Sequence, residues 1–218
     1  MKSFAIIGCG RFGGAVARTL YSLGYEVLAI DISEDIIKEI SDEVTHAAQA
    51  DVMDETVLKD LGLRNFDVAV VAIGSDIEAS IMATLVVKEL GIKKVVAKAL
   101  SDIHGKVLTK IGADRVIFPE RDMGLRLAHN LASANILDFI ELSPDYSILE
   151  VNALREWENR SLAQLKLSTK YGVNVMAIKR GNTINVSPNS EAVIEKDDIL
   201  VVIGSTNDIK TIEKKAGE

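Results

Sequence analysis

The feature that most constrains the fold is a glycine-rich loop near the start of the chain. Gly8, Gly10 and Gly13 lie in the segment GCGRFG, which follows the unbroken apolar run 4–7 and precedes a helical pattern. In the G-x-G-x-x-G pattern the first glycine permits a tight turn, the second lets the backbone approach a phosphate, and the third lets the helix pack on the sheet. The sequence therefore predicts a phosphate-binding loop between a buried strand and a helix N-terminus.

The first part of the chain alternates short apolar runs with helical patterns. Helices are expected to begin at capping residues such as Ser33, Asp54 and Ser101 and to end at glycines. Strands are predicted at 4–7, 26–31, 44–48, 67–74, 94–99 and 115–118. Strand–helix steps with such short connections predict an α/β fold, a Rossmann-like doubly wound parallel sheet with right-handed crossovers.

The pattern changes after the last of these strands. A long crossover helix is predicted over 121–139, and the segment LSPDYS at 142–147 indicates a turn and a boundary. Beyond it we expect a small α+β unit, with a hairpin at Gly181-Asn182. The predicted parts are a nucleotide-binding Rossmann domain at 1–120, a crossover and dimerisation helix with linker at 121–143, and a C-terminal dimerisation and ligand domain at 144–218.

Charge and cysteine content exclude several classes of protein. The net charge of −7 argues against a general attraction to nucleic acid or to an anionic membrane. The single cysteine, Cys9, excludes an internal disulfide and fits a reducing cytosol; we interpret it as a buried side chain rather than a reactive thiol. No apolar run approaches the roughly 18 residues that span a bilayer, and no signal peptide follows Lys2, so we expect a soluble protein.

Two charged residues indicate the ligand of the loop. Asp31, at the end of the second predicted strand, can accept hydrogen bonds from ribose hydroxyls and disfavours a 2′-phosphate, which favours NAD or an adenine nucleotide over NADP. Arg11, inside the loop, can bind terminal phosphates through two parallel hydrogen bonds, which suits a di- or triphosphate better than NAD. Either residue can also be an ordinary solvent-exposed side chain.

Three further charged residues lie at the C-terminal ends of later predicted strands, at the edge of the sheet where such folds bind ligands. They are Asp51, Lys98 and Glu120. Lys98 interrupts the apolar run VVAKAL, and we interpret it as facing a ligand. Glu120 can pair with Lys98, hold a divalent cation against phosphates, or be a surface acid.

The sequence offers little for catalysis. None of His46, His104 and His129 adjoins a carboxylate at a predicted strand end, and we interpret all three as structural or solvated. There is no Cys/His metal-ligand spacing, G-x-S-x-G motif or Walker lysine. Hydride transfer also needs an acid or base, and the C-terminal domain contains no histidine. We expect a nucleotide sensor that is not an enzyme; an NAD-dependent oxidoreductase is the alternative.

Several segments taken together resemble one family. They are IIGCGRFGGAVARTL, AIDIS, VAIGSDIEASI, VVAKA, KIGADRVIFPERDMG and KYGVNVMAIKRG. They resemble the RCK (also called KTN) proteins, the cytosolic regulatory subunits of bacterial Ktr and Trk potassium uptake systems, and the Ktr subunit above all. The resemblance implies RCK_N and RCK_C domains, homodimers assembling into an octameric ring, and a Ktr/Trk-type membrane potassium channel subunit as partner at the inner face of the cell membrane. It also implies gating by exchange of ATP and ADP, with NAD(H) as a further ligand, and no binding of nucleic acid.

By position, the resemblance also implies the residues of the nucleotide site. Lys98 would approach the phosphates, Arg11 would sense the γ-phosphate in its own or a neighbouring subunit, and Glu120 would help to hold a divalent cation. Ala50, Asp51, Ile73 and Gly74 would wall the adenosine. The full cofactor-binding set is Gly8, Gly10, Arg11, Phe12, Gly13, Asp31, Ile32, Ala50, Asp51, Ile73, Gly74, Lys98 and Glu120.

A second ligand, cyclic di-AMP, is implied at a dimer interface of the C-terminal domain. Asn174, Val175 and Pro188 match the surface that binds it in many members of the family. Members often carry an arginine two residues before the lysine of KYG, where this chain has Ser168 in LSTKYG. A guanidinium that would bind phosphate is therefore missing from this chain.

Overall fold

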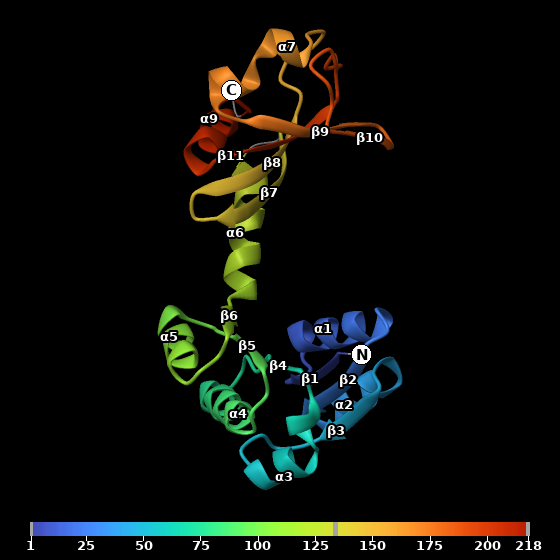
Figure 1. Cartoon of the computed structure of the whole chain (residues 1–218), viewed down its shortest axis with the longest axis vertical. Coiled ribbons are helices and arrows are strands. Elements are labelled where there is room, and N and C mark those ends of the chain that lie inside the picture. The colour runs from blue at the N-terminus through green and yellow to red at the C-terminus, as the bar shows by residue number, and fades with distance from the viewer. Residues whose placement is uncertain (1, 133–134, 217–218) are drawn as a thin grey trace. The chain divides into compact units, whose positions relative to one another are not determined.

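The structure is a computed structural model that describes residues 2–132 and 135–216. The chain divides into two compact units, Met1–Glu120 and Arg121–Glu218 (Figure 1). Each unit has a sheet and a hydrophobic core of its own, and each is described separately below.

The first unit is built on a parallel sheet, as predicted. Within the described residues it has six strands in the order β3-β2-β1-β4-β5-β6. The order reverses between β1 and β4, and the crevice at the carboxyl ends of two such strands is where doubly wound folds bind ligands. The strands are β1 (Ser3–Ile7), β2 (Glu26–Asp31), β3 (His46–Gln49), β4 (Val68–Val71), β5 (Lys94–Lys98) and β6 (Arg115–Ile117).

The helices of this unit begin at the capping residues that the sequence predicted. Ser33 accepts a hydrogen bond from the Ile36 N–H, Asp54 accepts from Thr56 and Val57, and Ser101 caps in the same way. These bonds satisfy donors that a helix start leaves unpaired. The helices of the first unit are α1 (Arg11–Ser22), α2 (Glu34–Ile40), α3 (Glu55–Asp60), α4 (Ile77–Glu89) and α5 (Asp102–Lys110), with short 3-10 helices at Ser41–Glu43 and Leu63–Asn65. Helix α6 (Pro119–Ala132) begins with the last two residues of this unit and continues into the second.

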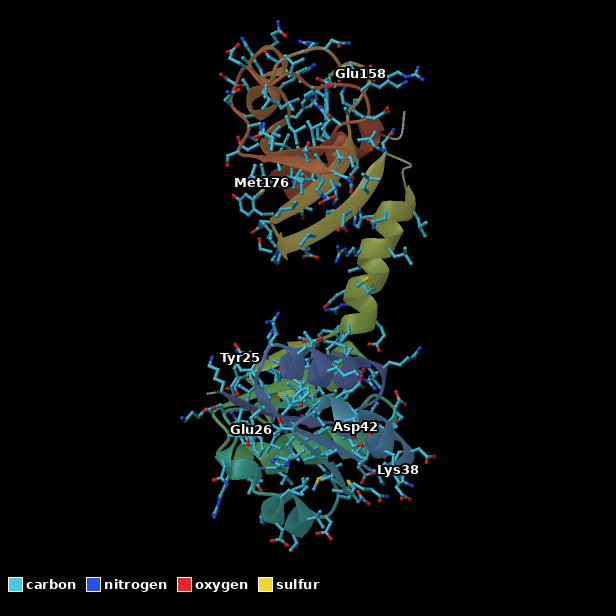
Figure 2. The ribbon with its side chains drawn as sticks, turned by 90° about the vertical axis from the view of Figure 1, so that its right-hand side faces the viewer. Tyr25, Glu26, Lys38, Asp42, Glu158 and Met176 are labelled. Carbon is cyan, nitrogen blue, oxygen red and sulfur yellow. The ribbon has the colours of Figure 1, made fainter. Side chains whose placement is uncertain are left out.

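The central strand β1 of the first unit is covered on both faces. On β1, Ala5 and Ile7 belong to one buried cluster and Ile6 belongs to another, and all three side chains are fully buried. Successive strand residues point to opposite faces, so a strand covered on both sides needs an unbroken apolar run. Charged side chains such as Lys38 and Asp42 project from the outer surface of this unit (Figure 2).

The second unit is an antiparallel sheet with helices packed on it. In the described part of this unit the strand order is β10-β9-β11-β8-β7. The predicted hairpin at Gly181-Asn182 joins β9 to β10, and Trp157 lies in the core at 1% exposure. The elements are β7 (Ile136–Ser143), β8 (Tyr146–Asn152), β9 (Asn174–Arg180), β10 (Thr183–Val186) and β11 (Ile199–Ser205), with α7 (Leu162–Leu165), α8 (Leu167–Tyr171) and α9 (Thr206–Ala216).

The helix predicted over 121–139 is wrong in its second half. Helix α6 ends at Ala132, and 136–143 forms the strand β7, which pairs with β8 and places Phe139 opposite Leu149. The predicted turn at 142–147 is a tight hairpin connection, with strand residues on both sides of Pro144. Pairing with β8 decides the conformation here against the local helical spacing.

Candidate functional site

The glycine loop lies between β1 and α1, as predicted. Gly8 has a left-handed φ of +88°, and its N–H donates to the Ile30 carbonyl at 2.8 Å. A methyl group at Gly13 would lie 1.8 Å from the Gly8 oxygen, so α1 meets the strand end too closely for any side chain. A methyl group at Gly10 would meet nothing within 4 Å. The loop is tightly packed on its inner side and open in front of Gly10.

The N-terminus of α1 faces this open space without a capping side chain. Gly10 is its N-cap residue, and the first turn holds no acidic residue. The first N–H groups of a helix carry a partial positive charge and favour an anion. Arg11 is exposed on the same turn. A phosphate group therefore suits this end of the helix.

Asp31 ties the end of β2 to the loop. Its Oδ2 accepts a hydrogen bond from the Cys9 N–H at 2.7 Å, and its Oδ1 accepts from the Ser33 N–H at 2.9 Å. Each carboxylate oxygen can accept a further bond. Asp31 can therefore bind ribose hydroxyls while it fixes the loop, and sequence reasoning missed the second of these roles.

The residues expected to wall an adenosine lie around the neighbouring strand ends. The Ala50 N–H donates to the Asp31 carbonyl at 3.0 Å. A methyl group at Gly8 would lie 3.0 Å from Ile73 Cγ1, so Ile73 lies against the loop. Ile32 is 64% exposed. Asp51 is also exposed, and its carboxylate accepts from the Met53 N–H, a contact within its own turn.

Lys98 and Glu120 form an ion pair, which was one of the alternatives left open by the sequence. Lys98 Nζ donates to Glu120 Oε1 at 2.5 Å, and the ammonium lies 5.9 Å from the centre of the Phe12 ring. Lys98 is 7% exposed. The hydrogen bond from Lys98 holds the pKa of Glu120 below its usual range, and the positive charges of Lys98 and Arg11 lower the pKa further.

Cys9, His104 and His129, three of the residues considered for reactivity or catalysis, are buried or make contacts within the protein. Cys9 is buried, and burial raises the pKa of its thiol to about 12, which fits the predicted inert side chain. His104 Nδ1 accepts from the Leu100 N–H, and His129 stacks on Phe139. In the part of the chain that the structure describes, no group of three His, Cys, Asp or Glu side chains could hold a metal ion. A cation held by Glu120 would therefore need further ligands, such as the oxygens of a bound phosphate.

A shallow pocket of about 260 Å³ lies in the second unit, between the short helices and the start of β9. It contains Asn174 and Val175, which the sequence assigned to a second ligand, together with Ser168, whereas Pro188 does not line it. Further along β9, Met176 is 41% exposed. The lining residues are Leu162, Ala163, Lys166, Leu167, Ser168, Thr169, Val173, Asn174 and Val175.

No helix among residues 2–132 and 135–216 has the length and apolar character needed to cross a membrane.

Two family models match this chain. The TrkA-N domain model matches residues 4–119, and the TrkA-C domain model matches residues 147–217. The chain is 50% identical to the Ktr system potassium uptake protein C of Bacillus subtilis over 214 residues. This aligned region covers 98% of this chain and 97% of that protein. The chain is 44% identical to the Ktr system potassium uptake protein A of the same bacterium, covering 98% and 96% of the two chains.

A solved structure supports the fold. The GsuK channel bound to NAD superposes with a TM-score of 0.70 over 100% of this chain and 40% of that chain, at 15% sequence identity. This likeness concerns the arrangement of strands and helices in the two chains.

Proposed function

This chain belongs to the family of Ktr potassium uptake proteins built from a TrkA-N and a TrkA-C domain, and from that premise we propose that it is a cytosolic nucleotide-sensing regulatory subunit. In this role it binds ATP or ADP, or NAD(H), in the first unit and gates a membrane potassium transporter. The observation that carries the proposal is the open space at Gly10, in front of the uncapped N-terminus of α1.

The groups around that space fit an adenine nucleotide. Asp31 has acceptor capacity left for ribose hydroxyls, and Arg11 and Lys98 supply positive charge for phosphates. Glu120 supplies one carboxylate toward a divalent cation bound to the phosphates. In this proposal the side chains orient the nucleotide and neutralise its charge, and no bond of the nucleotide is broken.

The assembly is part of the same proposal. The relatives are named as proteins of the Ktr potassium uptake system. We place this chain at the inner face of the cell membrane, as homodimers that form an octameric ring on a Ktr/Trk-type channel subunit. The segments proposed for dimerisation are 121–143 and 147–204.

Gating requires that ATP and ADP favour different shapes of the ring. A ligand shifts a conformational equilibrium only by the difference between its affinities for the two states. Arg11 and Glu120 are the groups able to distinguish the two nucleotides, Arg11 by its charge and Glu120 through a cation. The ATP-bound state is the one that we propose to raise potassium flux.

The test is potassium flux through proteoliposomes that contain the channel subunit with which this protein co-purifies. ATP should raise the flux relative to ADP when binding of both nucleotides has been verified. Equal flux under the two nucleotides, with both bound, would contradict the gating model.

An NAD-dependent oxidoreductase is the second candidate, because the glycine loop and Asp31 also suit NAD. A thermal-shift comparison of ATP, ADP and NADH ranks the ligands first, since a ligand that binds the folded state raises its melting temperature. Steady oxidation of NADH by the pure protein with a small carbonyl substrate would then favour the enzyme over the sensor.

A further inference from the structure

Lys98 is a buried cation whose partner is exposed. Its side chain is 9% exposed, whereas the side chain of Glu120 is 65% exposed. A buried ammonium needs a counter-charge, because removing it from water without one is costly. The exposed carboxylate can turn away into solvent, but the buried ammonium cannot. The pair is therefore one in which only the partner of Lys98 can be exchanged.

The ammonium keeps hydrogen-bonding capacity for a second anion. Lys98 has three N–H donors, and Glu120 accepts one of them. A methyl group at Gly74 would lie 3.1 Å from Lys98 Nζ, and Nζ lies 5.9 Å from the centre of the Phe12 ring. Phe12 belongs to the glycine loop, so the ammonium adjoins the phosphate position proposed above.

We propose that Glu120 is a built-in competitor of the ligand's phosphates for Lys98, so that a ligand carrying a di- or triphosphate must displace the Glu120 carboxylate before its phosphates can reach the ammonium. Such a ligand offers Lys98 a stronger anion than one carboxylate, whereas adenosine alone leaves the Lys98–Glu120 pair intact. The inference rests on the proposed function, because it takes an adenine nucleotide as the ligand.

The Glu120 carboxylate has other positive charges to interact with once it is displaced from Lys98. The hydrogen bond from Lys98 is the main cause of the lowered pKa of Glu120, and the positive charge of Arg11 is a smaller one. A carboxylate freed from Lys98 can turn toward Arg11 or toward a divalent cation on the phosphates. Competition for Lys98 therefore precedes any role of Glu120 as a cation ligand, and the two are separated by removing divalent cations.

Calorimetry on the full chain, with divalent cations chelated, tests the competition. Glu120→Gln should bind ADP about threefold to tenfold more tightly than the unmodified protein, because the competing charge is gone while the exposed surface is kept. Its affinity for adenosine should not change. Asp122→Asn removes the same charge from an exposed position on the same helix, and it should leave both affinities within about twofold.

Thermal unfolding gives a second readout that separates competition from a merely structural role. Glu120→Gln should melt earlier than the unmodified protein without ligand, because Lys98 loses its partner, and it should gain more from saturating ADP. When Lys98 has already been replaced by Met, adding Glu120→Gln should no longer tighten the binding of ADP; the double variant is compared with Lys98→Met.

Two results would overturn the inference, and they differ. If the unmodified protein binds ADP and Glu120→Gln binds it equally or more weakly without divalent cations, Glu120 does not compete, and the proposed function stands. If the folded, unmodified protein binds no adenine nucleotide, the proposed function fails and the inference fails with it.

Discussion

At the residue scale, we propose that Arg11 distinguishes a triphosphate from a diphosphate. It is exposed on the first turn of α1, beside the open space at Gly10. Arg11→Ala should therefore weaken the binding of ATP more than the binding of ADP. A charged hydrogen bond contributes about 1.5–3 kcal/mol, so the preference for ATP should fall by about tenfold or more. Calorimetry with each nucleotide measures this, and equal losses would make Arg11 a general phosphate contact. Lysine should be a poor substitute, because it lacks the planar fork.

Asp31 holds the loop, and we propose that it also binds the ribose, so its replacement should affect both stability and ligand binding. Asp31→Ala should weaken the binding of ATP, ADP and NADH alike, because all three ligands share the adenosine ribose. It should also lower the free energy of unfolding by about 1–3 kcal/mol, because the Cys9 and Ser33 N–H groups lose their acceptor. Asp42→Ala, at an exposed position on the same unit, serves as the control (Figure 2). Unchanged affinities for all three ligands would contradict the ribose assignment.

The sequence could place the residues of the site but could not supply all of their contacts. It predicted that Asp31 and Lys98 stand at strand ends, because parallel strands bring their carboxyl ends to one edge. It did not predict that Asp31 holds the Cys9 N–H, since that bond depends on the conformation of the loop. The Lys98–Glu120 pair was one of several alternatives, because the burial of Lys98 that makes the pair necessary is a property of the fold.

At the scale of elements, the joint between β1 and α1 gives a matched pair of variants. Gly13→Ala puts a methyl group 1.8 Å from the Gly8 oxygen, so it should lower stability by about 2 kcal/mol or more. Gly10→Ala puts its methyl group into open space, at a φ of −63° that alanine adopts freely, so stability should change by less than about 1 kcal/mol.

The two variants should separate folding from binding. Gly10→Ala should still lose ADP affinity by about tenfold or more, because its methyl group occupies the space proposed for a phosphate. Urea unfolding and calorimetry measure the two effects. Normal ADP binding by Gly10→Ala would show that phosphates do not approach the loop at this position.

The ion pair of Arg180 and Asp198 joins β9 to the start of β11. Asp198 is fully buried and accepts two hydrogen bonds from Arg180, at 2.8 Å each, and one from the Glu195 N–H. Burial alone would raise the pKa of Asp198, but these hydrogen bonds outweigh burial and hold the pKa below its usual range.

This pair should make the stability of the chain depend on pH. A lowered folded-state pKa contributes stability above the unfolded value of about 3.9, and that contribution is lost as the pH falls through the folded-state value. Arg180→Met should cost about 3 kcal/mol at pH 7, because it leaves a buried charge unpaired, and its deficit should shrink below about pH 4. Urea unfolding at both pH values checks this, with exposed Arg155→Met as the control. A deficit that does not vary with pH would contradict the assignment.

The elements that the sequence predicted well are those with local signals. Cap residues marked the helix starts, and unbroken apolar runs marked the parallel strands. The error at 136–143 has a physical cause. The residues there continue a helical apolar spacing, and no glycine or proline interrupts the run between Ala132 and β7. What makes them a strand is the partner β8, which lies beyond the turn and leaves no mark in the segment itself.

At the scale of the whole molecule, the two units carry separate candidate ligand sites. The pocket of the second unit holds Asn174 and Val175 but has Ser168 where an arginine would bind phosphate. We expect calorimetry on the full chain to give weak or no heat with cyclic di-AMP, and Ser168→Arg to restore binding, because a guanidinium returns two donors for phosphate. The ADP affinity of this variant should not change. Tight binding of cyclic di-AMP by the unmodified chain would show that Ser168 is no obstacle.

The position of Trp157 has a practical consequence for spectroscopy. It is the single tryptophan of the chain, and it is buried in the second unit at 1% exposure. Its fluorescence should shift to longer wavelength when that unit unfolds and water reaches the indole. Emission excited at the red edge of the absorption band therefore reports on the second unit alone, while circular dichroism follows both units. Transitions that differ between the two signals would give the stability of each unit in the intact chain, without cutting it.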